Sequence, residues 1–393
     1  MEAAEGLELV ESLLRIHVRA VACGAMHSLA CSSQGEVWAW GNGGSGRLGL
    51  GHTAHVVRPA KVPQLASIRA LACGDGHSLA VSAQGKLWAF GCNVRNQLGV
   101  EEAWQDRCLP TPVCNLEDRH VVAVVAGHAH SACLDSTGAL FTWGAGDVGC
   151  LAHGGGEDHA APAQVRQLPS SSRVTALWSG SFHMGVVMGN RDLFAWGLGT
   201  SGQLGHGSFA TAFVPKRVDL TSAVVSVDGS VAHTLIVTER SGVLACGQVD
   251  ASHKVPVPTM LPALRGLDVQ SVVCGGFQSL ARTGPGGNSL LYWDGPPSGE
   301  HVELAGPRRM QTLGVSCGGQ HVLVVVAKQW LKQSEVSHCM ECRLEFGFTQ
   351  FKHVCRSCRK IVHSSCSSHR KALPEQGFQD PVRVCDSCAR AII

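Results

Sequence analysis

The sequence predicts an all-β protein in which a seven-repeat β-propeller is followed by a small double-zinc domain. The first observation is a Gly-x-x-His phrase that returns every 43 to 53 residues between His27 and His321. The second is a glycine content of 47 residues, which favours many tight turns between short strands. The third is a set of paired cysteine and histidine residues, spaced as metal ligands, between Cys339 and Cys388.

The repeated phrase consists of an apolar strand, a turn and a second apolar strand. It reads "VACGAMHSLA" and "LACGDGHSLA" in the first two copies. A second phrase, such as "GEVWAWGNGGSGRLGLG", follows the first four copies and is shortened to "GVLACGQ" and "LLYWDG" in the fifth and sixth. The histidine position of the first phrase falls at His27, His77, His130, His183, His233, Gln278 and His321.

Repeats of this length, with strand-like alternation and no helical stripe, indicate an architecture built from small sheets. One such sheet cannot bury both faces alone, whereas a ring of sheets buries them against one another and leaves few open edges. Seven copies therefore predict seven blades over residues 18–328. Because the last copy has no Trp-Gly phrase after it, we expect a short closing blade, or one that borrows a strand from the N-terminal segment 1–17.

Two motifs in the repeats resemble catalytic or cofactor signatures, but their context argues against that. Gly-x-Gly-x-x-Gly begins at Gly41, Gly144 and Gly197, yet no helical pattern follows it, as dinucleotide binding requires. "GVSCG" around Ser316 lies in a strand position and not at a strand-to-helix elbow. No catalytic constellation remains, and we predict that the protein is not an enzyme.

The repeated histidines and tryptophans are expected to be structural. Each imidazole belongs to a different blade, so we expect it to bond a backbone group within its own blade. Trp40, Trp143 and Trp196 are expected to pack between blades.

Composition places the chain among globular proteins of a reducing compartment. Hydrophobic residues make up 45% and charged residues 16%, and the formal net charge is +2, which argues against a nucleic-acid surface along the whole chain. The chain opens without a basic start and an apolar run, and no apolar stretch is long enough to span a membrane. We therefore expect a cytoplasmic or nuclear protein whose isolated cysteines are core residues.

Four ligand pairs in residues 329–393 predict a zinc domain. A pair separated by two residues directs two ligand atoms at one ion, and two pairs complete a closed tetrahedral site, so eight ligands predict two zinc ions. A domain of this size has too small a core to fold without metal, and disulfides would conflict with a reducing compartment. The pairs are Cys339 and Cys342, Cys355 and Cys358, His363 and Cys366, and Cys385 and Cys388.

The phrases "CGxxHSLA" and "WAWGxGxxGRLGLG" resemble the repeats of the regulator-of-chromosome-condensation family over roughly residues 18–328. The resemblance implies a seven-bladed propeller. Members of that family include an exchange factor for the GTPase Ran, other exchange factors and many interaction platforms.

Residues 329–393 resemble the FYVE zinc finger, which binds phosphatidylinositol 3-phosphate on endosomes. The resemblance lies in "SEVSHCMEC" and "PVRVCDSC". It implies a cross-braced domain in which the first and third ligand pairs hold one ion and the second and fourth pairs hold the other. His363 stands where the family usually has cysteine.

The same resemblance implies a lipid contact through Lys352, His353, Arg356 and Arg383. The family's basic phrase has an arginine where this chain has Phe351 and a second histidine where it has Val354, and its early acid is replaced by Gln333. Residues 329–393 carry ten Lys and Arg against six Asp and Glu. We therefore expect a weak, largely electrostatic contact with anionic membranes.

Three functions are compatible with these features. The first is a non-catalytic platform whose propeller binds a protein partner and whose zinc finger directs it, as a peripheral protein, to endosomal or other anionic membranes. The second is a guanine-nucleotide exchange factor for a small GTPase, which would need a protruding wedge that the repeat spacing does not show. The third, zinc-dependent ubiquitin ligation, is disfavoured because the spacing from Cys358 to His363 departs from RING-type sites.

Overall fold

The computed structural model describes residues 10–328, except 15, 241, 251, 277, 285–288, 296, 298–300, 305–309 and 320. In the C-terminal part it describes residues 353–355, 361–362, 364–373 and 378–391. The chain divides into two compact units, Met1–Ala327 and Lys328–Ile393.

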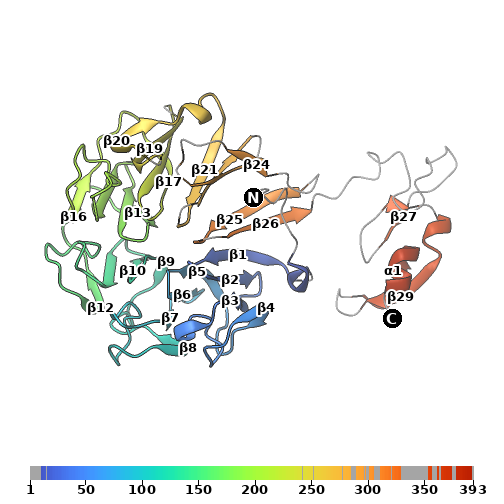
Figure 1. Ribbon diagram of the computed structural model, residues 1–393. Helices are drawn as coiled ribbons and strands as arrows, with labels where there is room; N and C mark the ends of the chain where they lie inside the picture. Colours follow the sequence, from blue (N-terminus) through green and yellow to red (C-terminus); the bar gives the residue numbers. More distant parts are fainter. Residues whose placement is uncertain are drawn as a thin grey trace. The chain divides into compact units, whose positions relative to one another are not determined.

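The first unit is an all-β propeller with six four-stranded antiparallel blades, whose strands follow the sequence order from the innermost strand outward (Figure 1). The first three blades are β1 (Val18–Cys23), β2 (His27–Ser32), β3 (Val37–Gly41) and β4 (Val56–Lys61); β5 (Ile68–Cys73), β6 (His77–Ser82), β7 (Leu87–Gly91) and β8 (Arg107–Pro112); and β9 (Val121–Ala126), β10 (His130–Asp135), β11 (Leu140–Gly144) and β12 (His159–Gln164). The next three are β13 (Val174–Ser179), β14 (His183–Met188), β15 (Leu193–Gly197) and β16 (Ala212–Arg217); β17 (Val224–Gly229), β18 (His233–Thr238), β19 (Gly242–Gln248) and β20 (Lys254–Met260); and β21 (Val269–Cys274), β22 (Gln278–Thr283), β23 (Ser289–Asp294) and β24 (Val302–Leu304). Short 3-10 turns η2 (Gly44–Gly46) and η3 (Pro262–Leu264) lie in the connections.

The seventh repeat forms a two-stranded sheet of β25 (Met310–Cys317) and β26 (Val322–Lys328) in the part of the chain that the structure describes. The prediction of seven blades was therefore wrong in the blade number, which is six. The reason is the missing Trp-Gly phrase, which supplies the third strand of the complete blades. β25 contacts both β21 and β1, so the innermost strands still form a closed circuit (Figure 1).

The described part of the N-terminal segment forms η1 (Glu11–Leu13), which contacts β4 of the first blade. Residues 1–9 lie outside the described residues, so strand donation from this segment stays a prediction.

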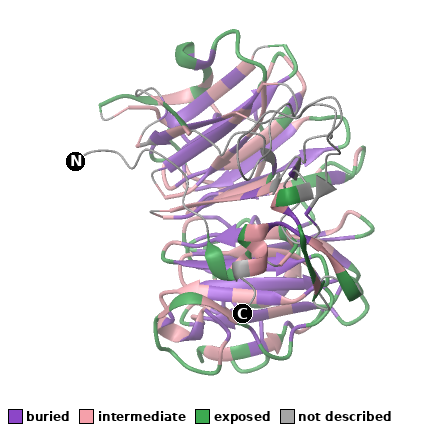
Figure 2. Cartoon of the chain, turned by 90° about the vertical axis from the view of Figure 1, so that its right-hand side faces the viewer, coloured by how far each residue is buried: buried purple, intermediate pink, exposed green. Residues whose placement is uncertain are grey.

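The second strands of the first five blades form the deepest layer of the propeller. All six residues of β2, β6, β10, β14 and β18 are buried, because neighbouring blades cover both faces of each sheet. Figure 2 shows buried residues along the strands and exposed residues mainly in the connections. On the outer strands, Pro59, Pro110, Pro162 and Pro215 remove backbone donors and so hinder pairing with another sheet.

The repeated histidines join neighbouring blades. His27 Nε2 lies 2.8 Å from Ser78 Oγ of the second blade, and His77 Nε2 lies 2.8 Å from Ser131 Oγ of the third. In both pairs the hydroxyl belongs to the residue directly after the histidine of the next repeat. The same contact joins His183 to Thr234 at 2.8 Å, His233 to Ser279 at 2.9 Å and His321 to Ser28 at 2.8 Å. The expected bond to a backbone group within the same blade was wrong, since the partner is a hydroxyl one blade away.

The hydroxyls also fix which imidazole nitrogen carries the proton. Ser78 Oγ donates to the carbonyl oxygen of Arg47 at 2.8 Å, and Ser131 Oγ donates to that of Gln97 at 2.7 Å. Because each hydroxyl already donates its proton to a carbonyl oxygen, it can only accept from the imidazole, and Nε2–H is the donor. Burial lowers the pKa of His27 and His77 to about 3, so both rings are neutral.

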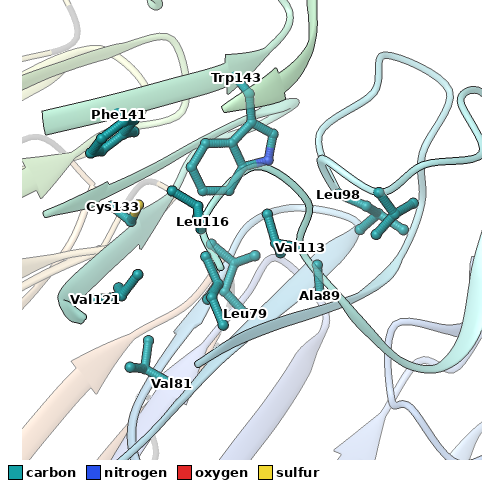
Figure 3. Close-up of a cluster of buried hydrophobic side chains, with 12 residues drawn as sticks. Leu79, Val81, Ala89, Leu98, Val113, Leu116, Val121, Cys133, Phe141 and Trp143 are labelled. Carbon is teal, nitrogen blue, oxygen red and sulfur yellow. The ribbon is translucent and has the colours of Figure 1, made fainter. Parts of the chain in front are cut away.

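Two of the three singled-out tryptophans confirm the prediction of packing between blades. Trp143 Nε1 donates to the carbonyl of Gln97 at 3.0 Å, and Trp196 Nε1 donates to that of Cys150 at 2.8 Å; both acceptors lie in the preceding blade. Figure 3 shows Trp143 in one apolar cluster with Leu79 and Leu98 of the second blade. Trp40 is only half-buried, because the sheet that precedes its blade in the ring is the two-stranded sheet β25–β26.

Replacing Ser131 by alanine should lower the free energy of unfolding of the propeller by about 1–3 kcal/mol, because His77 Nε2–H would be buried without an acceptor. Urea denaturation followed by tryptophan fluorescence measures this. Ser136→Ala is the matched control, since Ser136 is exposed, and it should change stability by less than about 0.5 kcal/mol. Equal effects of the two substitutions would contradict a stabilising role for the hydroxyl.

Acid should destabilise the propeller below about pH 6.5. The folded-state pKa is about 3 for His183 and about 4 for His130 and His233, and it is lowered for His321 as well. The unfolded chain therefore binds protons that the folded chain does not. The stability contribution of these rings is complete above the unfolded pKa of about 6.5 and is lost as pH falls toward 4 and 3, by up to about 1.4 kcal/mol per ring and pH unit.

One buried acid opposes this trend. Burial raises the pKa of Asp228 to about 7, so its single carboxyl favours folding as pH falls, but the imidazoles outnumber it. Thermal unfolding between pH 7.5 and 4.5, followed by tryptophan fluorescence, is the measurement, because only Trp330 lies beyond residue 328. A melting temperature that is flat or rises on acidification would contradict the expectation.

Candidate functional site

The C-terminal unit is built from two short hairpins and a terminal helix in its described part. β27 (His353–Val354) pairs with β28 (Ile361–Val362), and β29 (His369–Leu373) pairs with β30 (Phe378–Val384). The 3-10 turn η6 (Ser364–Cys366) and helix α1 (Asp386–Ala391) complete it. Its small core consists of Cys355, Val362, Val384 and Cys385.

Three predicted zinc ligands converge in this core. The sulfur atoms of Cys355, Cys385 and Cys388 all lie within 4.8 Å of one another. Cys355 directly follows β27, Cys385 directly follows β30 and Cys388 lies in α1, so three separate elements deliver them. Cys355 and Cys385 are both fully buried.

The local chemistry suits thiolates that hold a metal ion. The backbone N–H of Cys385 donates to Cys355 Sγ at 3.2 Å, and such a donor stabilises negative charge on sulfur. Three soft sulfur ligands in a buried position match a structural zinc site, which takes four ligands in a tetrahedron. When bound, the ion would tie the end of β30 to the end of β27, with Cys355, Cys385 and Cys388 as three of its ligands.

Of the other five predicted ligands, Cys366 lies among the described residues. Cys366 lies in η6 and is packed against the same core without joining the group of three sulfurs. The remaining four ligands, Cys339, Cys342, Cys358 and His363, lie outside the described residues. The complete set of eight ligands therefore stays a prediction.

Two of the four predicted lipid-contact residues, His353 and Arg383, lie in described strands. Arg383 lies in β30, two residues before Cys385, and is half-buried. His353 begins β27, whereas Lys352 and Arg356 lie outside the described residues.

The propeller carries a shallow cavity of about 510 Å³ at one end of its blades. This end holds the turns between the first and second strands of each blade and the connections between the third and fourth strands. Two of its charged groups have charged partners, whereas Arg47 donates to the backbone carbonyls of Gly44 and Asp75. Arg95 Nε and Nη2 each donate to Asp158 at 2.7 Å, and His128 Nδ1 lies 2.6 Å from Asp75 Oδ2, which raises the pKa of His128. These contacts hold the Arg95 and His128 side chains in fixed positions.

The motifs that resembled catalytic signatures are structural. Gly41 ends strand β3 and Gly46 ends the 3-10 turn η2 in the connection to β4. Ser316 lies in β25, where its Oγ accepts from the N–H of Cys23 at 3.0 Å. A side chain at Gly46 would meet the backbone of Cys108 in the next blade at 2.5 Å, so packing explains this glycine. Among the described residues, none of the helices has the length and apolar character of a membrane span.

Sequence comparison identifies both units. The profile of the RCC1-like domain matches residues 10–324. The chain belongs to the RCC1-like domain family. The profile of the FYVE zinc finger matches residues 329–393, so an RCC1-like propeller is followed by a FYVE zinc finger. Both are non-catalytic folds.

Two curated relatives match a part of this chain. The ultraviolet-B receptor UVR8 of Arabidopsis thaliana is 33% identical over 243 residues, which cover 61% of this chain and 55% of the receptor. The human E3 ubiquitin-protein ligase HERC2 is 29% identical over 338 residues, covering 80% of this chain and 6% of the ligase. The chain thus corresponds to about half or less of these proteins.

Solved structures support the propeller fold. Human WBSCR16 superposes with a TM-score of 0.70 at 20% identity, covering 79% of this chain and 87% of that chain. Yeast RCC1 (Prp20) bound to Kap60 gives a TM-score of 0.67 at 22% identity, covering 81% of each chain. At these identities the likeness shows the fold alone.

Replacing Cys388 by serine should remove about one zinc ion per chain, because one of four ligands of a structural site is lost. Elemental analysis of the purified full chain, expected to hold about two zinc ions before substitution, is the measurement. Cys92→Ser, a cysteine of the propeller, is the control and should leave the zinc content unchanged. Zinc content near zero in the unsubstituted chain would exclude the metal site.

Proposed function

We propose that this protein is a non-catalytic platform whose propeller binds a protein partner and whose FYVE zinc finger, with two zinc ions, directs it to anionic membranes. The observation that carries the proposal is the convergence of Cys355, Cys385 and Cys388 next to Arg383 in a unit that matches the FYVE profile. The metal would hold a basic strand in place for contact with a phosphorylated lipid. Because FYVE fingers serve endosomal membranes, we propose a peripheral location at the cytoplasmic face of endosomes.

Charge supports membrane contact by residues 329–393. They carry ten Lys and Arg against six Asp and Glu, whereas the rest of the chain has 22 against 24. Each cation near an anionic surface contributes about 1 kcal/mol to binding, and salt screens this contribution.

One face of the propeller is suited to a protein partner. The turns between β1 and β2 and the connections between third and fourth strands lie at the same end of the blades. Met26, Val94, Trp104 and Phe209 belong to these connections and are each at least half exposed. Val94 also lines the cavity, and exposed aromatic and methionine side chains are typical of protein-interaction surfaces.

The alternative of an exchange factor for a small GTPase receives less support. Exchange requires an element that intrudes into the nucleotide site of the GTPase. The described connections between β1 and β24 hold only the short 3-10 turns η2 and η3. We therefore propose binding without nucleotide exchange, with a small GTPase as one class of partner to test.

Membrane binding of the full chain should depend on both salt and zinc. Flotation with phosphatidylserine vesicles should show binding at low salt that falls sharply at physiological salt. Cys355→Ser should abolish it, because the metal site orders the basic strand. Cys92→Ser, in the propeller, should bind like the unsubstituted chain. If the unsubstituted chain fails to float with any anionic vesicle at low salt, the membrane function is excluded.

A further inference from the structure

The hairpin of the FYVE finger places two arginines directly opposite each other. Arg370 of β29 pairs with Arg383 of β30 in the antiparallel register. Side chains of directly opposed residues lie on the same face, with Cβ atoms about 4.5–5.5 Å apart. Two guanidinium groups can therefore reach one ligand between them.

The neighbouring cations of β29 lie on the other face of this hairpin. Lys371 Nζ donates to the carbonyl oxygen of Ala389 in α1 at 2.6 Å, and His369 Nε2 lies 3.8 Å from Asp386 Oδ1 in the same helix. Their cross-strand partners are Val382 and Val384, which pack in the core. Helix α1 thus holds Lys371 and His369, and alternation along the strand leaves Arg370 with Arg383 on the opposite face.

Like charges directly opposite in a sheet destabilise it unless an anion lies between them. Arg370 is exposed and Arg383 half-buried, and among the described residues no carboxylate pairs with either. The structure therefore displays two adjacent arginines with free donor groups. Such a pair matches a phosphate monoester, which carries nearly two negative charges and accepts two bidentate forks.

We propose that Arg370 is a phosphate-binding residue of this FYVE finger, acting with Arg383 on the phosphate monoester of a lipid headgroup. The inference rests on the proposed membrane function and adds a residue to it. It supplies an arginine to a finger whose basic phrase has Phe351 where the family has one. The selectivity for phosphorylated inositol lipids should accordingly exceed what net charge alone provides.

Arg370→Gln in the full chain should lower the selectivity for phosphatidylinositol 3-phosphate vesicles over phosphatidylserine vesicles of matched charge about tenfold at physiological salt. Arg58→Gln removes the same charge from an exposed position of the propeller and should leave that ratio within about twofold. Arg370→Lys restores the charge without the fork and should recover only part of the ratio. Zinc content should equal that of the unsubstituted chain in all three variants.

The outcomes separate the two proposals. An equal ratio for the unsubstituted chain and the Arg370→Gln variant overturns the role of Arg370 while leaving membrane binding intact. Calorimetry with soluble inositol 1,3-bisphosphate and with inorganic phosphate adds a test without membranes. The unsubstituted chain could bind the soluble headgroup and float with no vesicle. If Arg370→Gln then weakens the headgroup binding, the role of Arg370 is supported and the membrane function is excluded. Absence of binding in both assays overturns both proposals.

Discussion

The hydrogen bond from each repeated imidazole to a hydroxyl of the next sector is the interaction on which the ring depends. Ser78 receives the Nε2–H of His27 and donates to the carbonyl of Arg47, so one buried hydroxyl bonds the preceding blade twice. A bond of this kind contributes only about 1 kcal/mol, but each partner is buried and costs more if left alone. Because His321 meets Ser28, the same contact also joins the last repeat to the first.

Divergence of the later repeats leaves visible defects in this network. Met184 stands where the hydroxyl would be in the fourth blade, and His130 turns instead to Ser179 at 3.1 Å. Gln278 Oε1 and Trp293 Nε1 are buried without a hydrogen-bond partner, whereas the corresponding Trp196 reaches a carbonyl of the preceding blade. The fifth repeat has lost the turn that would supply this carbonyl, so the junction between the fifth and sixth blades lacks this hydrogen bond.

The sequence indicated the strands and the turns because each depends on residues near one another in the chain, whereas the convergence of Cys355 with Cys385 and Cys388 was implied by the resemblance to the FYVE finger. Spacing alone directs Cys385 and Cys388 to one ion, and periodicity alone places His27 and His77 at equivalent positions. The hydroxyl partners were missed since they lie about one repeat away, although a Ser or Thr after most of the histidines was a usable signal. Arg370 was missed because only the register of β29 against β30 brings it opposite Arg383, and the pairing of these two strands was not predicted.

Metal binding and the display of charge are physically coupled in the FYVE finger. Cys385 ends the strand that carries Arg383, and its backbone N–H already bonds Cys355 Sγ, so an ion on these sulfurs fixes the end of β30. Helix α1 begins directly after Cys385 and holds Lys371 through the carbonyl of Ala389, which orients β29. Without the ion, thiolates in this core would repel one another and the hairpin would lose both anchors. An ion bound to these sulfurs would therefore support the strand pairing that brings the two opposed arginines together.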